Sequence, residues 1–146
     1  MMEIDKDKKM ELTVSHEQGL VPVTVLHVEG RVDGSNYKQV IAKAQELYDG
    51  GARNLLFDLK KVAFLSSAGM SALHRTAKLF QGAAHSELEE GWAEFRAMGR
   101  DRDAGYQKHV KLLAPPEPVC QTLELVGFTR YFEIFEDLDK AVASFQ

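Results

Sequence analysis

The sequence lacks several features that would assign it to a specialised class of protein. It has one cysteine, Cys120, so no disulfide can form within the chain. Its apolar stretches are interrupted every few residues and fall far short of the roughly 20 residues of a membrane-spanning helix. Its charged start, residues 1–9, lacks the apolar run of a signal peptide. We therefore expect a cytoplasmic protein without a membrane segment.

Positive charge is also scarce. Lys and Arg number 18 against 22 Asp and Glu, which gives a net charge of −4 at pH 7. Without a basic block, binding to nucleic acid through phosphate neutralisation is not expected. The five histidines include no pair spaced four residues apart, and no glycine-rich nucleotide motif is present. We therefore expect neither a metal ion nor a cofactor.

The chain does have the size and composition of one ordinary globular domain. Its 146 residues are 45% hydrophobic and 27% charged, close to the average for folded domains. Residues 1–9 are charged and show no periodicity, so they are expected to form a flexible N-terminus. A single domain is then predicted over residues 10–146.

Hydrophobic periodicity predicts an α/β fold. Strands are expected over 10–15, 21–28, 54–59, 109–113 and 133–135, and helices over 37–48, 70–80, 117–126 and 138–145. The first strand alternates and should lie at an edge, whereas the next two are apolar on both faces and should be interior. A strand, helix, strand order implies a parallel crossover. The prediction is a mixed, mostly parallel sheet of four to five strands with helices packed against it.

Residues 82–108 are longer than the usual connection in such a fold. Within this segment Leu88, Trp92 and Phe95 have helical spacing, and 99–105 is polar. We expect a helical insertion whose apolar stripe packs on its own domain or, as the favoured alternative, on a second copy of the chain to form a homodimer.

Two serines, Ser66 and Ser67, lie between the apolar residues 62–65 and a predicted helix. A serine at this place is most often an N-cap. The free N–H groups and the dipole of a helix N-terminus also accommodate phosphate, and phosphorylation would add about −1.5 to −2 charges at pH 7. The residues alone leave both interpretations open.

The segment from Asp58 to Leu73 resembles the signature of STAS domains and, among them, anti-sigma factor antagonists. In that signature an acid at a strand end precedes Asp-Ser-Ser/Thr-Gly at the start of a helix. Asp58 matches the acid, Ser67 the phosphorylated serine and Gly69 the glycine. The sequence departs from the pattern at Ser66, where the family usually has Asp, and at Ala68, where it usually has Ser or Thr. Residues 25–33 and 126–135 also resemble family segments, so the likeness covers 10–81 and 109–145.

The resemblance implies a STAS fold and a binding module with no catalysis of its own. It implies that the unphosphorylated chain binds an anti-sigma factor, commonly a serine protein kinase, and so releases a sigma factor to regulate transcription. Phosphorylation at Ser67, with Ser66 as second choice, would block that complex. The expected partner-binding residues are Asp33, Asp58, Ser66, Ser67, Gly69 and Met70. A plain cap for the first helix is an equal alternative for Asp33.

Two other functions compete with this one. A STAS subunit of a stressosome-like or transporter-associated assembly would use the insertion as a docking arm, and the partner that co-purifies would distinguish it. An enzyme with Ser66 or Ser67 as nucleophile is disfavoured, because the motif contains no candidate base and no Gly-x-Ser-x-Gly turn.

Overall fold

The computed structural model describes residues 10–82, 96, 100 and 105–146. These residues form five strands, four α-helices of more than one turn and a short 3-10 helix. In chain order the elements are β1 (Glu11–Gln18), β2 (Pro22–Val32), α1 (Tyr37–Asp49), β3 (Leu55–Leu65), α2 (Ser67–Phe80), β4 (Val110–Leu113), α4 (Glu117–Leu125), η2 (Phe128–Arg130), β5 (Ile134–Phe135) and α5 (Leu138–Ser144).

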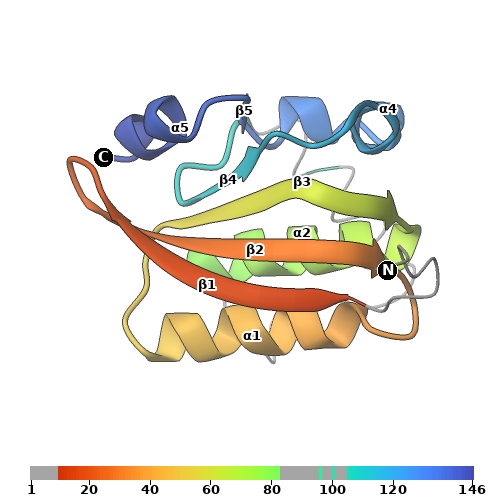
Figure 1. Cartoon of the computed structure of the whole chain (residues 1–146), viewed down its shortest axis with the longest axis horizontal. Coiled ribbons are helices and arrows are strands. Elements are labelled where there is room, and N and C mark those ends of the chain that lie inside the picture. The colour runs from red at the N-terminus through yellow and green to blue at the C-terminus, as the bar shows by residue number, and fades with distance from the viewer. Residues whose placement is uncertain (1–9, 83–95, 97–99, 101–104) are drawn as a thin grey trace, which may run out of the picture.

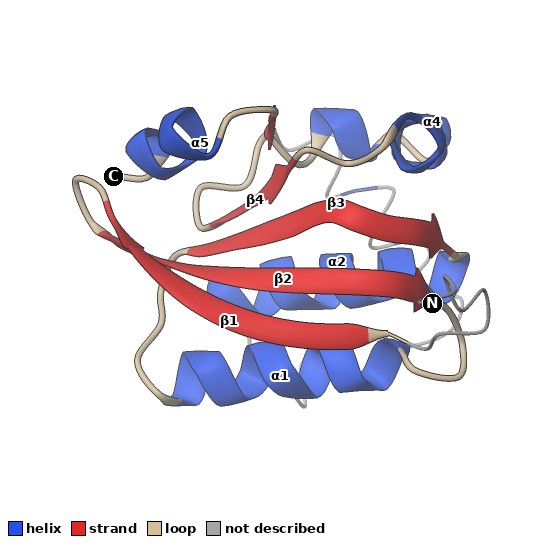
Figure 2. Ribbon diagram, in the orientation of Figure 1, coloured by secondary structure: helices blue, strands red, loops and turns tan. Residues whose placement is uncertain are grey.

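The five strands form one sheet in the order β1-β2-β3-β4-β5 (Figures 1 and 2). β1 pairs antiparallel with β2 at one edge, and each later neighbour pairs in parallel. Helix α1 makes the crossover from β2 to β3, and α2 begins directly after β3. The prediction of a mixed, mostly parallel sheet in an α/β fold is confirmed, and so is the edge position of the first strand.

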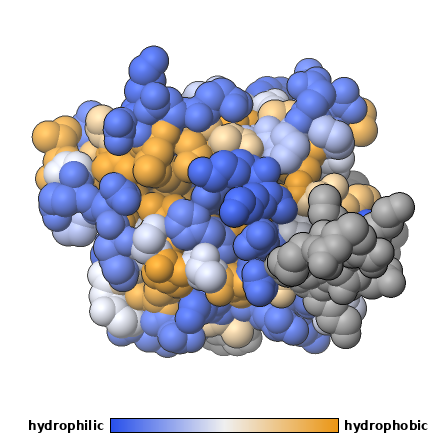
Figure 3. All heavy atoms as spheres, in the orientation of Figure 1, coloured by the Kyte–Doolittle hydropathy of each residue, from blue (hydrophilic) through white to orange (hydrophobic). Residues whose placement is uncertain are grey.

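Both faces of the sheet carry apolar cores, but to different extents. The larger core packs residues of α1, α2 and α4 against side chains such as Leu26 and Phe57. On the other face the short helix α5 covers Val23, Val25 and Leu56. In Figure 1 α2 lies behind the sheet, and the front of β1 and β2 is left uncovered by the helices drawn in colour. Figure 3 shows hydrophilic side chains across the middle of this uncovered face.

Strands β2 and β3 run further than the sequence predicts, because β-bulges interrupt the alternation of apolar residues. The register shifts between His27 and Glu29 and again between Gly30 and Arg31. Gly30 has φ 97°, a conformation that glycine adopts without strain. The predicted ends at residues 28 and 59 are therefore wrong, since the strands continue to residues 32 and 65.

The predicted N-terminal segment and most of the predicted insertion, including Leu88, Trp92 and Phe95, lie outside the described residues. The described chain resumes at Gly105, and Gln107 is already buried, with its N–H donating to the carbonyl of Tyr131 (2.9 Å). Packed structure thus begins slightly before residue 108, where the insertion was expected to end. Among the described residues, no helix has the length and apolar character needed to cross a bilayer.

The start of α2 approaches β2 so closely that a side chain at Gly69 would not fit. A Cβ there would lie 2.6 Å from Cδ1 of Leu65 and 3.0 Å from the carbonyl oxygen of Val32. Overpacking of this kind costs about 1–3 kcal/mol. We expect Gly69→Ala to lower the free energy of unfolding by that amount in urea denaturation. Gly34→Ala is the matched control, because nothing lies within 4 Å of its Cβ; equal stability of the two variants would contradict the packing.

Candidate partner-binding site

The ends of two parallel strands bring the predicted site residues together. Val32 of β2 is the register partner of Leu65 of β3, so the segments that follow these two residues start side by side. The Ser66 N–H donates to the carbonyl oxygen of Val32 (2.9 Å) and fixes the start of α2 against the end of β2. Asp33, Ser66 and Ser67 therefore lie together at the edge of the sheet that the carboxyl ends of β2 and β3 form.

Ser66 is the N-cap of α2. Its backbone is extended (φ −81°, ψ 176°), and its Oγ accepts a hydrogen bond from the Gly69 N–H (3.2 Å). Its carbonyl accepts from the Met70 N–H (2.9 Å), the first bond of the helix. The side chain is half-buried and engaged in the cap, which is the role that the sequence predicts for Ser66 when Ser67 is the switch.

Ser67 is the first residue of α2 and is exposed to solvent. It lies at the positive end of the helix dipole, next to N–H groups that an anion can use. The first turn of α2 has no acidic side chain, so no carboxylate of that turn would oppose a phosphate there. Electrostatics and exposure at this position are compatible with a phosphorylated hydroxyl.

Asp33 organises the turn that leads into α1. Its Oδ1 accepts from the N–H (2.9 Å) and the Oγ (2.6 Å) of Ser35, and its carbonyl accepts from the Tyr37 N–H (2.9 Å). The N-cap position of α1 belongs to Asn36, whose Oδ1 accepts from the Asp33 N–H (3.0 Å). Asn36 occupies the N-cap position but makes no side-chain cap hydrogen bond, whereas Asp33, three residues earlier, accepts the cap-like hydrogen bonds of the turn that precedes the helix.

The structure places the other predicted site residues away from this surface. Met70 is 5% exposed and belongs to the main core, and Gly69 is buried against Val32. Asp58 is not at a strand end: it lies inside β3, about 23 Å along the strand from Leu65 at roughly 3.3 Å per residue. Its carboxylate bonds to His27 instead of facing Ser67. Asp58 and Met70 are thus buried and Gly69 has no side chain, so these three residues form no exposed surface with Ser67, and their role in partner binding stays a prediction.

Two residues near the site were missed by the sequence analysis. Arg31 and Phe64 are register partners at the ends of β2 and β3, and the guanidinium carbon of Arg31 lies 4.6 Å from the centre of the Phe64 ring. Phe64 is 42% exposed, an unusual exposure for so large an apolar side chain. The signal was hidden because the bulge after Gly30 breaks the alternation that would have shown which face each side chain occupies.

Nothing in the described residues forms a metal site, since no group of three His, Cys, Asp or Glu side chains comes together there. Cys120 is also unsuited to be a ligand or nucleophile. Burial raises the pKa of its thiol, and the carboxylates of Glu136, Glu117 and Glu124 raise it further. The thiol form is therefore favoured over the reactive thiolate.

Comparison with known families agrees with this arrangement. A family model described as "STAS domain" matches residues 13–84, which include most of β1, all of β2 and β3, and both segments of the candidate site. The chain is a STAS domain protein. A search of curated proteins finds no match.

Solved structures share the fold of this STAS domain. An anti-sigma factor antagonist from Mycobacterium paratuberculosis superimposes with a TM-score of 0.67 at 17% identity, over 98% of this chain and 97% of that one. SpoIIAA in its unphosphorylated form gives 0.53 at 12% identity, with 90% and 93% covered. The Bacillus cell fate determinant SpoIIAA in its phosphorylated form gives 0.54 at 14% identity, with 89% and 96% covered. At these identities the likeness establishes the fold.

The free energy of unfolding tests the separate roles of Ser66 as the cap of α2 and Ser67 as an exposed hydroxyl. Ser66→Ala removes the capping oxygen of α2 and should lower the free energy of unfolding by about 1 kcal/mol. Ser66→Asp supplies another capping oxygen and should retain most of the stability. Ser67→Ala, at an exposed position, should change it by less than about 0.5 kcal/mol. Urea denaturation measures all three, and a larger loss in Ser67→Ala than in Ser66→Ala would contradict the assignment.

Proposed function

We propose that this STAS domain is an anti-sigma factor antagonist whose complex with an anti-sigma factor is controlled by phosphorylation of Ser67. The observation that carries the proposal is the exposed hydroxyl of Ser67 at the N-terminus of α2, beside the turn of Asp33. Structures with the same fold include SpoIIAA in phosphorylated and unphosphorylated forms. The partner in this proposal is a serine protein kinase, which would transfer a phosphoryl group from ATP to Ser67 Oγ.

A phosphate at Ser67 would change the charge of the surface more than its shape. The neutral hydroxyl can be covered by a partner at little cost, whereas phosphorylation adds about −1.5 to −2 charges. The Asp33 carboxylate, in the neighbouring turn, makes that part of the surface more negative still. A partner shaped for the unmodified surface would have to desolvate this charge or be repelled by it.

The structure also supports Ser67 over Ser66 as the acceptor. The Oγ of Ser66 is half-buried and accepts from the Gly69 N–H, so a phosphoryl group there would displace the cap of α2. The Oγ of Ser67 is exposed and can be modified without breaking the cap. Phosphorylation of Ser67 would therefore disturb the start of α2 less than phosphorylation of Ser66.

We assign the partner surface to the exposed groups around Ser67. Asp33 and the Arg31–Phe64 pair flank it at the ends of the same two strands. Phe64 offers apolar area and Arg31 a planar cation, two side-chain types enriched at protein interfaces. Gly69 and Met70 serve this surface by packing the first turn of α2, not by touching the partner.

The switch is tested by placing a permanent charge at Ser67. Affinity capture from the source cell identifies the partner, and calorimetry then measures its binding. Ser67→Asp should weaken binding by about 1–3 kcal/mol, because a charge enters the interface, and Ser67→Ala should bind like the unmodified chain. Incubation with the kinase and ATP should label the chain on Ser67, and Ser67→Ala should not be labelled.

Gln18→Glu is the matched control for charge. It adds a negative charge at the β1–β2 hairpin, at the opposite end of the strands from Ser67, and should leave affinity unchanged. Equal affinities of the Ser67→Asp and Ser67→Ala variants would place the serine outside the interface. Capture of a transporter component or a sensor scaffold in place of an anti-sigma factor would reject the proposed partner.

We further propose that residues 82–108 carry a homodimer contact, since their apolar stripe is not required by the described fold. Deleting 83–104 and joining Gly82 to Gly105 by a short linker should leave the domain folded. Residues 105–107 are kept because Gln107 is buried and its side chain accepts from Gln81. Light scattering should show a lower mass for the deletion protein. An unchanged oligomer would remove the segment as the contact, and loss of the circular dichroism spectrum would make it part of the core.

A further inference from the structure

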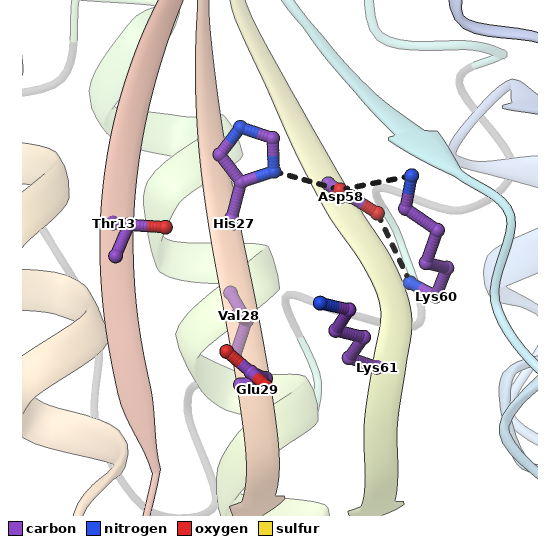
Figure 4. A pocket seen from close by; sticks show the side chains of 7 residues that line it. All are labelled: Thr13, His27, Val28, Glu29, Asp58, Lys60 and Lys61. Carbon is purple, nitrogen blue, oxygen red and sulfur yellow. Dashed lines mark hydrogen bonds and ion pairs between the residues drawn. The ribbon is translucent and has the colours of Figure 1, made fainter.

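Three side chains on the uncovered face of the sheet form a continuous hydrogen-bonded chain. Ser15 Oγ lies 2.7 Å from Nε2 of His27, and Nδ1 of His27 lies 2.7 Å from Oδ2 of Asp58. Each residue comes from a different strand, β1, β2 and β3. Figure 4 shows the His27 ring directed at Asp58 between the two strands. A hydroxyl, an imidazole and a carboxylate in this order are the elements of an activated nucleophile.

Strand register brings these residues together. His27 and Asp58 are direct partners in the parallel pair β2–β3. In the antiparallel pair His27 lies opposite Thr13, so Ser15 is its diagonal neighbour on the same face. Side chains two positions apart on a strand share a face, which gives the chain of three a fixed geometry on the sheet.

The contacts of Asp58 fix the roles of the two imidazole nitrogens. Its carboxylate is 6% exposed, accepts from the backbone N–H of Lys60 (3.1 Å) and pairs with the Lys60 ammonium (3.7 Å). An ionised carboxylate only accepts, so Nδ1 of His27 carries the proton that it donates to Asp58. In a neutral ring Nε2 then has a lone pair and accepts from the Ser15 hydroxyl. The hydroxyl hydrogen is thus directed at a base.

The imidazole is open to solvent. The His27 side chain is 37% exposed and faces a hollow of about 350 Å³. The hollow is lined by Thr13, His27, Val28, Glu29, Asp58, Lys60 and Lys61. Because of the bulge in β3 opposite residues 27–29, two consecutive lysines, Lys60 and Lys61, line the hollow, where a regular strand would direct only one of them to this face. The hollow gives a small molecule access to the imidazole of His27, and Ser15, which is half-buried on β1, lies beside that ring without lining the hollow.

We propose that Ser15 is a nucleophilic hydroxyl that accepts an acyl group from an activated donor such as an aryl ester or a thioester. Ser15 Oγ forms the bond to the acyl carbon while Nε2 of His27 takes the hydroxyl proton as general base. The bond from the acyl carbon to the leaving oxygen or sulfur breaks, and the proton leaves with that group. Asp58 is a positioning residue that holds the imidazole tautomer. The proposal is independent of the function of Ser67.

The position of Lys60 limits the reactivity. Its ammonium lies at the Asp58 side of the ring, whereas Ser15 lies at the Nε2 side, so Lys60 is not placed to stabilise an oxyanion that forms at Ser15. Donors with good leaving groups are therefore expected to react, and the acyl group is expected to remain on Ser15 after one turnover.

The probe for this site is 4-nitrophenyl acetate with the full chain. We expect a burst of one equivalent of 4-nitrophenolate, with peptide mass spectrometry locating the acetyl group on Ser15. Ser15→Ala should abolish the burst, and His27→Gln should slow acylation about 100-fold or more. His16→Gln and Ser35→Ala are matched controls, since His16 is the next residue on β1 and exposed, and Ser35 is an exposed serine bonded to Asp33. Both should react like the unmodified chain.

Asp58→Asn tests the positioning role by a spectroscopic signature. The proton between Nδ1 and the carboxylate should give a downfield proton resonance that is lost in Asp58→Asn and His27→Gln, with acylation slowed in both. Circular dichroism checks the fold, and Ser15→Ala, which removes one oxygen from an edge strand, keeps the test valid where a His27 variant fails to fold. Acetyl groups on Lys60 or Lys61 alone, or a burst that persists in Ser15→Ala, would overturn the proposal and leave the three residues a structural hydrogen-bonded chain.

Discussion

The parallel pairing of β2 with β3 is the constraint on which the rest of the structure depends. β2 has β1 and β3 as neighbours over most of its length, whereas β3 pairs with both β2 and β4 over residues 55–58 and with β2 alone beyond them. Their register aligns Val32 with Leu65, so the turn of Asp33 and the start of α2 meet at one edge. The Ser66 N–H bond to Val32 and the glycine that allows close contact hold that edge together. The hydroxyl at the first position of α2, Ser67, is exposed, and its neighbour Ser66 is the cap.

The same strand pair carries a second cluster of functional groups at its middle. The register that aligns Val32 with Leu65 also aligns His27 with Asp58, and the antiparallel edge strand adds Ser15. The two clusters differ in character. At the strand ends the side chains are exposed and form the surface that we propose for a protein partner, whereas at the middle a carboxylate is buried beneath an accessible imidazole. Changes at one cluster can be made without altering the residues of the other.

The sequence predicts much of this fold because most elements have a single dominant period. The alternation at Leu12 and Val14 and the helical stripes of α1 and α2 are local signals, and so is the cap at Ser66. The bulges give no such local signal, because an extra residue in β3 moves every side chain that follows it to the opposite face of the sheet. For this reason the strand ends, the exposed Phe64 and the interior position of Asp58 were missed. The motif predicts Met70 as a partner-binding residue, but a motif does not show which side of α2 packs on the core, and Met70 lies on that side. The Ser15, His27 and Asp58 cluster depends on register between distant strands, which no local pattern contains.

The proposed function depends most on one surface, the edge formed by the ends of β2 and β3, which an anti-sigma factor would cover. The most direct measurement is amide hydrogen exchange of the chain, alone and in complex with the captured anti-sigma factor. Slower exchange confined to residues 31–36 and 64–68, with the β1–β2 hairpin at 18–22 unchanged, is the predicted result. Unchanged exchange at 64–68 together with protection of the hairpin or of α5 would contradict it.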